Sequence, residues 1–296
     1  MTDVFMRFFV RAVRRMKLSH LRAFGKCLGT IGYHAARKRR NIALSNLDLA
    51  YGDTLSKREK CEIARACFQN LMMTFLEFLY SPVAGECFTD YVDLVKGENF
   101  HEANRRGKGV LVIVPHMGNW ELIGRFFAWV GVKAHAVSRK QDPPWLGRLI
   151  AEIRAANGIL EIDKRNALRP VLSALKRGET VNLLIDQHAR KDSIPTRFFG
   201  HTAMTVASAA LIALRTGCSV VTAASYRKPD GNLGVEVSPI IETIRSDDYE
   251  QDIQANTQRY VDEIEKFVRR FPHSWMWMHQ RWRLNNNKPE PGEPGP

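Results

Sequence analysis

The sequence predicts an α/β protein with a mixed, mainly parallel central sheet flanked by helices, preceded by an amphipathic helical region. Between residues 108 and 241, short apolar runs rich in β-branched residues alternate with helical patterns, which is typical of a sheet with helices on both faces. Two runs, GVLVIVP and TVNLLID, have the composition expected of central buried strands. With 296 residues, 45% hydrophobic and 25% charged, the chain has the size and composition of a folded protein.

The N-terminal segment carries most of the net charge of +13, because residues 1–40 hold 11 Lys and Arg residues and a single acidic residue. Residues 4–17 show helical periodicity with one apolar and one basic side. The apolar stripe consists of Phe5, Phe8, Phe9 and Val13, and the basic side of Arg7, Arg11, Arg14 and Arg15. A basic amphipathic helix of this kind is typical of a segment that lies in a membrane interface.

A second interpretation of this segment is a solvated basic helix that packs on its own domain. It does not resemble a cleavable signal peptide, because Arg7 and Arg11 interrupt the apolar stretch. Residues 18–36 contain Arg22 and Lys26, so they fall short of an uninterrupted apolar span of ~20 residues. Because the excess charge is confined to the N-terminal region, we expect no nucleic-acid partner.

The body of the chain divides at recognisable start and stop signals. A helix over residues 56–80 begins with Ser56 and Glu59 in a capping-box pattern, and the turn KPDGN joins residues 219–227 and 233–241 into a hairpin. The other expected strands are 108–114, 133–138 and 180–186, and the other expected helices are 118–130, 143–156, 166–177, 205–216 and 247–271. We predict three regions: basic membrane-associating helices over 1–40, a single α/β domain over 41–284, and a disordered proline-rich tail over 285–296.

Several common catalytic and nucleotide-binding motifs are absent from the sequence. The sequence has no G-x-S-x-G elbow, no G-x-G-x-x-G, no P-loop and no H-E-x-x-H, which removes the usual support for hydrolase, dinucleotide, NTPase and zincin functions. The five cysteines include no C-x-x-C pair, which argues against a zinc ribbon or a disulfide scaffold and fits a reducing compartment.

The segment VPHMGNWELIG at 114–124 is the strongest candidate for a catalytic site. His116 follows directly on a buried strand, where open α/β sheets build their sites. Since residues five apart do not share a helix face, His116 is expected in the turn before the helix, with Gly118 letting Glu121 reach the imidazole. A carboxylate on one ring nitrogen fixes the tautomer and leaves the other to accept a hydroxyl proton. The alternative is a core histidine capped by a nearby acid.

A His-x4-Glu box after a buried strand resembles the glycerolipid acyltransferase superfamily, and the rest of the chain is similar to its lipid A branch, the late lauroyl and myristoyl transferases. The similarity runs from about Arg39 to Arg283. The matching segments are RRNIALSNLDLAYGD, FLEFLY, KGVLVIVPHMGNWELIG, SRKQDPPWLGRLI, ALKRGETVNLLIDQ, PTRFFGHTAMTVASAALIALRTG, YRKPDGNLGVEV and PHSWMWMHQRWR. The Pro-Glu-Gly box of glycerol-3-phosphate-type acyltransferases is missing, and Ile185 to His188 stand in its place, which favours the lipid A branch.

The resemblance implies an O-acyltransferase that moves a fatty acyl chain from the thioester of acyl carrier protein to a hydroxyl of a lipid A precursor. In this mechanism His116, oriented by Glu121, removes the hydroxyl proton directly, so no covalent enzyme intermediate, metal or cofactor is expected. Arg139 matches the basic residue before the family's Asn/Asp-Pro turn and is our candidate donor to the oxyanion, the alternative being a phosphate-binding or structural arginine.

Four further residues are expected to bind substrate on the strength of the same resemblance: Asp186, Gln187, Arg197 and Phe199. Asp186 ends the second buried strand at the same sheet edge as His116, where it would orient Arg139 or the acceptor, or only cap a turn. Phe199 belongs to an aromatic pair that either lines an acyl tunnel or packs in the core.

The implied partners are acyl carrier protein, a lipid A precursor or related glycolipid, and the inner membrane, at whose cytoplasmic face we expect the protein. Two other hypotheses stay open: the same chemistry on another glycolipid or aminolipid acceptor, and a non-enzymatic basic protein that binds membranes.

Overall fold

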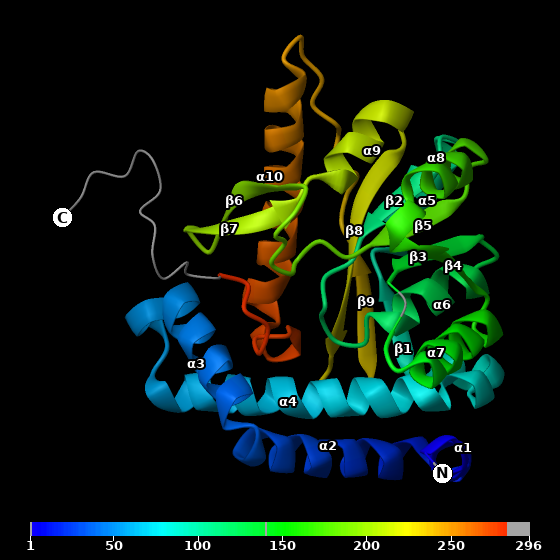
Figure 1. Ribbon diagram of the computed structural model, residues 1–296, viewed down its shortest axis with the longest axis vertical. Coiled ribbons are helices and arrows are strands. Elements are labelled where there is room, and N and C mark those ends of the chain that lie inside the picture. Colours follow the sequence, from blue (N-terminus) through cyan, green and yellow to red (C-terminus); the bar gives the residue numbers. More distant parts are fainter. Residues whose placement is uncertain (1, 140, 283–296) are drawn as a thin grey trace.

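The computed structural model describes residues 2–139 and 141–282 and confirms the α/β class (Figure 1). The central sheet consists of β1 (Val92–Val95), β2 (Val110–Ile113), β3 (Ala134–Ser138), β4 (Ile159–Asp163), β5 (Thr180–Leu183), β8 (Ser219–Arg227) and β9 (Leu233–Val237). Its strand order is β1-β9-β8-β2-β5-β3-β4. All neighbours are parallel except β8 and β9, which form the predicted antiparallel hairpin.

Helices cover both faces of the sheet because its central strands are apolar on both sides. These helices are α5 (Gly97–Arg105), α6 (Glu121–Trp129), α7 (Pro144–Ala156), α8 (Leu168–Lys176), α9 (Ser208–Thr216) and α10 (Tyr249–Arg270). Alternate residues of a strand point to opposite faces. Leu111 and Ile113 of β2 therefore pack in a cluster with α8, α9 and α10, whereas Val110 and Val112 pack in a second cluster with α5 and α6.

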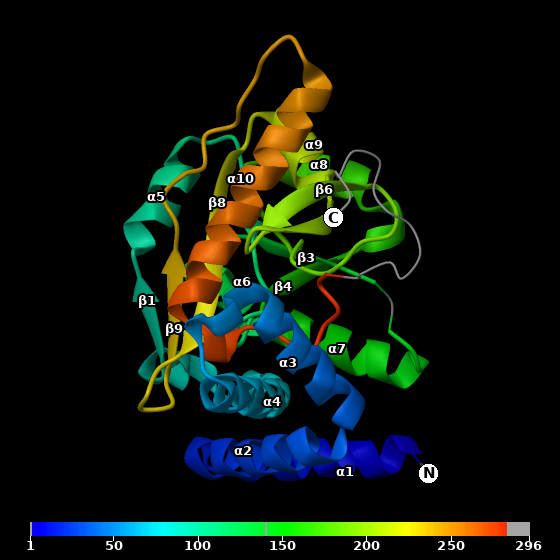
Figure 2. The same ribbon diagram turned by 90° about the vertical axis from the view of Figure 1, so that its left-hand side faces the viewer.

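Four N-terminal helices form a further layer at one end of the sheet (Figures 1 and 2). They are α1 (Thr2–Arg15), α2 (Leu18–Ala35), α3 (Arg37–Tyr51) and α4 (Lys57–Tyr80). Both views show α2 running alongside α4. A Cβ on Gly29 would lie 2.3 Å from the Cα of Gln69, so glycine is what allows α2 and α4 to approach so closely. The predicted capping box of Ser56 and Glu59 is present at the start of α4.

The amphipathic helix α1 forms, but only part of its predicted apolar stripe faces outward. Val10 and Val13 pack with Leu79 and Ile153 in a cluster shared with α4 and α7. Val13 is 1% exposed, whereas Phe8 is 71% exposed. The prediction that Val13 enters a membrane interface is therefore wrong, because α4 and α7 offer an apolar surface that the sequence of α1 alone does not reveal. No helix within the described residues is long and apolar enough to cross a membrane.

The predicted boundaries between regions of the chain can be compared with the helices and strands of the structure. The boundary at residue 40 falls within α3, which runs unbroken across it. The predicted tail over 285–296 lies outside the described residues. The two-stranded ribbon of β6 (Ser193–Phe198) and β7 (His201–Val206) was not predicted, and Gln258 of α10 holds it by bonding the backbone N–H and C=O of Arg197.

Candidate active site

His116 lies in a tightly held loop between β2 and α6. Gly118 of this loop has a φ of +57°, and a Cβ there would lie 2.3 Å from the carbonyl oxygen of Ser225, so the loop needs glycine at this position. Asn70 and Thr74 of α4 both donate to the carbonyl of Gly118. The layer of N-terminal helices thus fixes the loop from outside the sheet.

The acidic partner of His116 is Asp186 and not Glu121. Nδ1 of His116 lies 2.7 Å from Oδ1 of Asp186, and the backbone N–H of His116 donates to Oδ2 at 2.8 Å. The strand register explains the pair: Ile113 of β2 is level with Leu183 of β5, so the residues three positions further along each chain meet at the sheet edge. The prediction that Glu121 orients the imidazole is therefore wrong.

The electrostatics of the pair favour an ionised Asp186. Burial opposes the charge of this carboxyl, which is 3% exposed as a residue, but the charge and hydrogen bonds of His116 and the indole of Trp275 outweigh burial and hold its pKa below the ordinary value. An ionised carboxylate can only accept, so Nδ1 of His116 carries the proton. Nε2 is then the basic nitrogen, on a side chain that is 19% exposed.

Glu121 instead forms a two-point ion pair with Arg154 of α7. Nε and Nη2 of Arg154 donate to its two carboxylate oxygens at 3.0 and 2.7 Å. Burial opposes the charge of Arg154, but Glu121 and Glu161 outweigh it and raise the pKa of the guanidinium. Glu121 pairs with Arg154 and not with His116 because it is the first residue of α6, where its side chain meets α7. Sequence reasoning missed Arg154, whose segment gave no sign of an acidic partner.

An apolar pocket lies between α4, the start of α6 and α7. Its lining consists of Leu71, Thr74, Phe75, Phe78, Leu79, Trp120, Glu121, Leu146, Leu149 and Ile150. Trp120 links the pocket to the histidine, because its ring lies edge-on to the imidazole with centroids 5.2 Å apart. Trp120 thus belongs to the pocket wall and also contacts the imidazole of His116.

A buried carboxylate anchors the end of the histidine loop. Glu77 of α4, which is 2% exposed, bonds Arg22 of α2 and Arg227 of β8, and it also accepts from the side chain of Asn119 at 2.9 Å. Burial opposes the charge of Glu77, but the two arginines hold its pKa below the ordinary value. This network joins the N-terminal helices to the candidate site.

The other residues predicted to act on or bind substrate lie in three different parts of the structure. Arg139 follows β3, two strands away from β2 in the sheet; it is exposed, and within the described part of the chain its guanidinium makes no hydrogen bond or ion pair. Gln187 is next to Asp186, and its carbonyl accepts from Arg281. Arg197 and Phe199 belong to the β6–β7 ribbon and its turn.

Phe199 does not line the pocket. It is 5% exposed and packs against Tyr51, Trp277 and Arg269, while its N–H bonds Glu265. The aromatic pair therefore packs in the core, which was one of its two expected roles, and contact of Phe199 with substrate stays a prediction. In the described part of the chain no three His, Cys, Asp or Glu side chains form a group that could hold a metal ion.

The fold and the histidine pair define an α/β protein with a His–Asp pair at the carboxyl edge of its central sheet. The chain belongs to the bacterial lipid A biosynthesis acyltransferase family, whose model matches residues 1–284.

Two relatives illustrate the range of the similarity. The lipid A biosynthesis palmitoleoyltransferase of Escherichia coli is 24% identical over 268 residues, which cover 88% of this chain and 83% of that protein. The phosphatidylinositol mannoside acyltransferase of Mycolicibacterium smegmatis is 23% identical over 197 residues, which cover 65% of this chain and 63% of that protein. Among solved structures, the 1-acyl-sn-glycerophosphate acyltransferase of Thermotoga maritima matches with a TM-score of 0.38 and 14% identity, over 82% of this chain and 94% of that one.

Proposed function

We propose that this protein is an O-acyltransferase of bacterial glycolipid biosynthesis, which transfers a fatty acyl chain from acyl carrier protein to a hydroxyl of a lipid A precursor. The observation that carries the proposal is the His116–Asp186 pair, whose imidazole contacts Trp120 in the wall of an apolar pocket. The acceptor class is supported by membership of the lipid A biosynthesis acyltransferase family.

His116 acts as the general base in the proposed mechanism. Its Nε2 takes the proton of the acceptor hydroxyl, and the oxygen attacks the carbonyl carbon of the thioester. The resulting tetrahedral oxyanion collapses as the C–S bond breaks, and the imidazolium returns the proton to the leaving thiolate. Asp186 stabilises the imidazolium that exists between these two steps, so its role is orientation and charge stabilisation rather than the substrate binding predicted from the sequence.

The apolar pocket is the proposed site of the acyl chain. Its walls of Leu71, Phe75, Phe78, Leu146 and Ile150 offer methyl, methylene and ring surfaces to a hydrocarbon chain. Glu121, paired with Arg154, is the one charged residue among the described residues that line this pocket. A paired carboxylate there keeps the site polar for the thioester and the acceptor hydroxyl without leaving an uncompensated charge. Arg139 stays the proposed donor to the oxyanion, and Gln187 and Arg197 stay proposed contacts of the substrate head group.

A different acceptor is the second candidate, favoured by the likeness to the mycobacterial mannoside acyltransferase. In that case the His116 chemistry is unchanged and the acceptor hydroxyl belongs to another glycolipid. Acceptor identity would then depend on polar residues around the sheet edge and not on the acyl pocket.

We place the protein at the cytoplasmic face of the inner membrane, where acyl carrier protein is available. Support comes from the outer side of α1 and α2, where Phe8, Phe24 and Ile31 are 71%, 40% and 58% exposed. Arg11 and Lys26 are also exposed on these helices. Exposed apolar side chains among cations suit an interface with anionic lipid head groups.

The test is transfer by purified enzyme, measured by mass spectrometry of the acceptor after incubation with acyl-acyl carrier protein or acyl-CoA. We expect lipid A precursor to gain one acyl chain, carrier protein to be the better donor, and folded His116→Ala to be inactive. A gain by phosphatidylinositol mannoside alone would select the second acceptor. Absence of transfer to every glycolipid offered, together with unchanged lipids after deletion of the gene, would overturn the proposal.

A further inference from the structure

The C-terminal segment 272–282, which we call the strap, pairs with the histidine loop through its backbone. Gly118 N–H donates to the carbonyl of Ser274 at 2.9 Å, and Met276 N–H donates to the carbonyl of His116 at 3.1 Å. Between these bonds, Met117 and Trp275 form an antiparallel bridge. The strap therefore fixes the backbone of the loop that carries the proposed base.

The same strap also bonds the second loop of the site, which follows β5. Arg281 donates to the carbonyl of Gln187 at 3.2 Å, and the N–H of His188 donates to Nε2 of His279 at 3.2 Å. Both bonds are made to the two residues that follow Asp186 in the chain. One segment from the end of the described chain thus holds both members of the His116–Asp186 pair in place.

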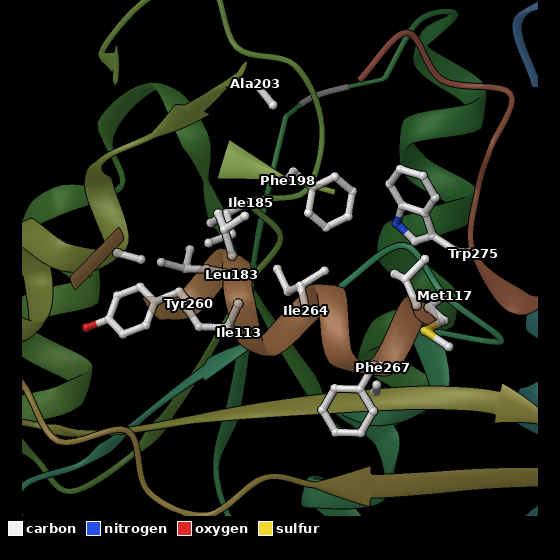
Figure 3. Packing of buried hydrophobic residues seen from close by; sticks show 14 of the residues in the cluster. Ile113, Met117, Leu183, Ile185, Phe198, Ala203, Tyr260, Ile264, Phe267 and Trp275 are labelled. Atoms are coloured by element: carbon white, nitrogen blue, oxygen red, sulfur yellow. The ribbon is translucent and has the colours of Figure 1, made fainter. Parts of the chain in front are cut away.

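Trp275 is the strap residue that reaches the carboxylate itself. Its indole Nε1–H donates to Oδ2 of Asp186 at 2.9 Å, and the side chain is 2% exposed. Figure 3 shows the Trp275 indole beside the ring of Phe198 and above Met117 in the buried hydrophobic cluster. The ring centroids of Trp275 and Phe198 are 5.4 Å apart. Packing therefore leaves the indole little freedom to turn away from the carboxylate.

We propose that Trp275 is a positioning residue for the general base: its indole N–H fixes the orientation of the Asp186 carboxylate, so that Oδ1 faces Nδ1 of His116. The inference rests on the proposed function. Oδ2 accepts from two fixed donors, the backbone N–H of His116 and the indole, and this leaves Oδ1 for the imidazole. Without the indole, the carboxylate could rotate and the tautomer of His116 would be less strictly set.

The proposed role predicts the direction in which the pH profile of the enzyme shifts when the indole is removed. The other titratable groups that interact electrostatically with the pair are His279 and Arg281 of the strap, and Arg39 of α3 interacts with His279. Removing the indole donor makes the Asp186 carboxylate more basic and a stronger partner for the imidazolium. Both consequences move the acidic limb of the kcat/KM profile to higher pH.

The test compares Trp275→Phe with a matched control, Trp277→Phe. Trp277 is another buried indole of the strap, 0% exposed, but it donates to the carbonyl of Pro272 and not to the site. We expect Trp275→Phe to lower kcat about tenfold with little change in KM for the acyl donor, and to shift the acidic limb upward. Trp277→Phe should lower the melting temperature by a similar amount without moving the limb.

A second variant separates hydrogen bonding from packing in case Trp275→Phe does not fold. Benzothienylalanine at position 275 keeps the shape of the bicyclic ring but has sulfur in place of the N–H group. We expect it to reproduce both the loss of kcat and the shift of the limb. A benzothienylalanine enzyme with the kcat and the acidic limb of the wild type would overturn the role of Trp275. A wild-type protein without transferase activity would overturn the proposed function instead.

Discussion

Asp186 receives two hydrogen bonds from one residue, His116: one from the backbone N–H at 2.8 Å and one at Nδ1 at 2.7 Å. The backbone bond makes the pairing independent of the imidazole rotamer, because the carboxylate stays next to the loop even when the ring moves. The Nδ1 bond then selects the tautomer with a basic Nε2. Asp186 is thus built into the loop as well as into the proposed chemistry.

The first prediction concerns this carboxylate. Asp186→Asn should lower kcat by about 10³–10⁴, because an amide that donates to Nδ1 would favour the wrong tautomer. Steady-state kinetics with circular dichroism as a check of folding measure the effect. The control is Asp163→Asn, which removes a carboxylate at the end of β4 that caps Arg165 and does not touch His116. If both variants lost activity equally, tautomer control by Asp186 would be disproved.

How far the site could be predicted depends on which interactions are local in sequence. His116 was found because a histidine directly after an apolar strand is visible in one segment. Its partner was not, because Glu121 is near in sequence while Asp186 is brought in by the pairing of β2 with β5. A local hint was available: His116 and Asp186 each stand three residues beyond the paired strand ends.

The same reason explains the successes and failures in the fold. The β8–β9 hairpin and the α4 cap are set by neighbouring residues, and both were predicted. The strand β4 (Ile159–Asp163) was missed because it lies at the sheet edge with Leu160 and Glu161 exposed, and its acidic residues interrupt the apolar run. The inward face of α1 was missed because its partner surface belongs to α4 and α7, far along the chain.

The second prediction concerns the ion pair at the pocket. Glu121→Gln keeps the shape of the side chain but removes its charge and leaves Arg154 paired only with Glu161. We expect kcat/KM to fall about 10²-fold, Arg154→Gln to cause a similar loss, and the double variant to lose little more, because both act through one pair.

The pH profile distinguishes this role from the one that the sequence suggested. Since Glu121 does not bond His116, the acidic limb of kcat/KM should stay at the wild-type pH in Glu121→Gln. A limb that moved to lower pH, as expected when an imidazolium loses a carboxylate partner, would instead place Glu121 on the imidazole. Fully additive losses in the double variant would show that Glu121 and Arg154 act separately.

The third prediction concerns acid stability. Burial lowers the pKa of His279 to about 4 from the ordinary 6.5, and its Nε2 accepts from His188 N–H, which requires the neutral form. Between these pH values the unfolded chain binds a proton that the folded chain does not. The free energy of unfolding should therefore fall as the pH is lowered from 6.5 to 4.

Chemical denaturation over this pH range tests the assignment. His279→Gln keeps a carbonyl acceptor for His188 without a titrating group, so its stability should depend less steeply on pH than that of the wild type. The control His101→Gln changes an exposed histidine of α5 and should keep the wild-type slope. Equal slopes in all three proteins would refute the role of His279.

The last prediction separates the two sides of α1. Val13→Ala removes methyl groups from a side chain that is 1% exposed and packed against α4 and α7, so it should lower the free energy of unfolding by about 1–2 kcal/mol. Phe8→Ala removes a larger side chain that is 71% exposed, so it should change stability by less than about 0.5 kcal/mol.

If Phe8 enters the interface as proposed, its loss should weaken binding to vesicles of anionic lipid about tenfold, while Val13→Ala leaves binding unchanged in the folded protein. Denaturant titration and vesicle sedimentation measure the two effects. Wild-type vesicle binding by Phe8→Ala would mean that other residues make the membrane contact.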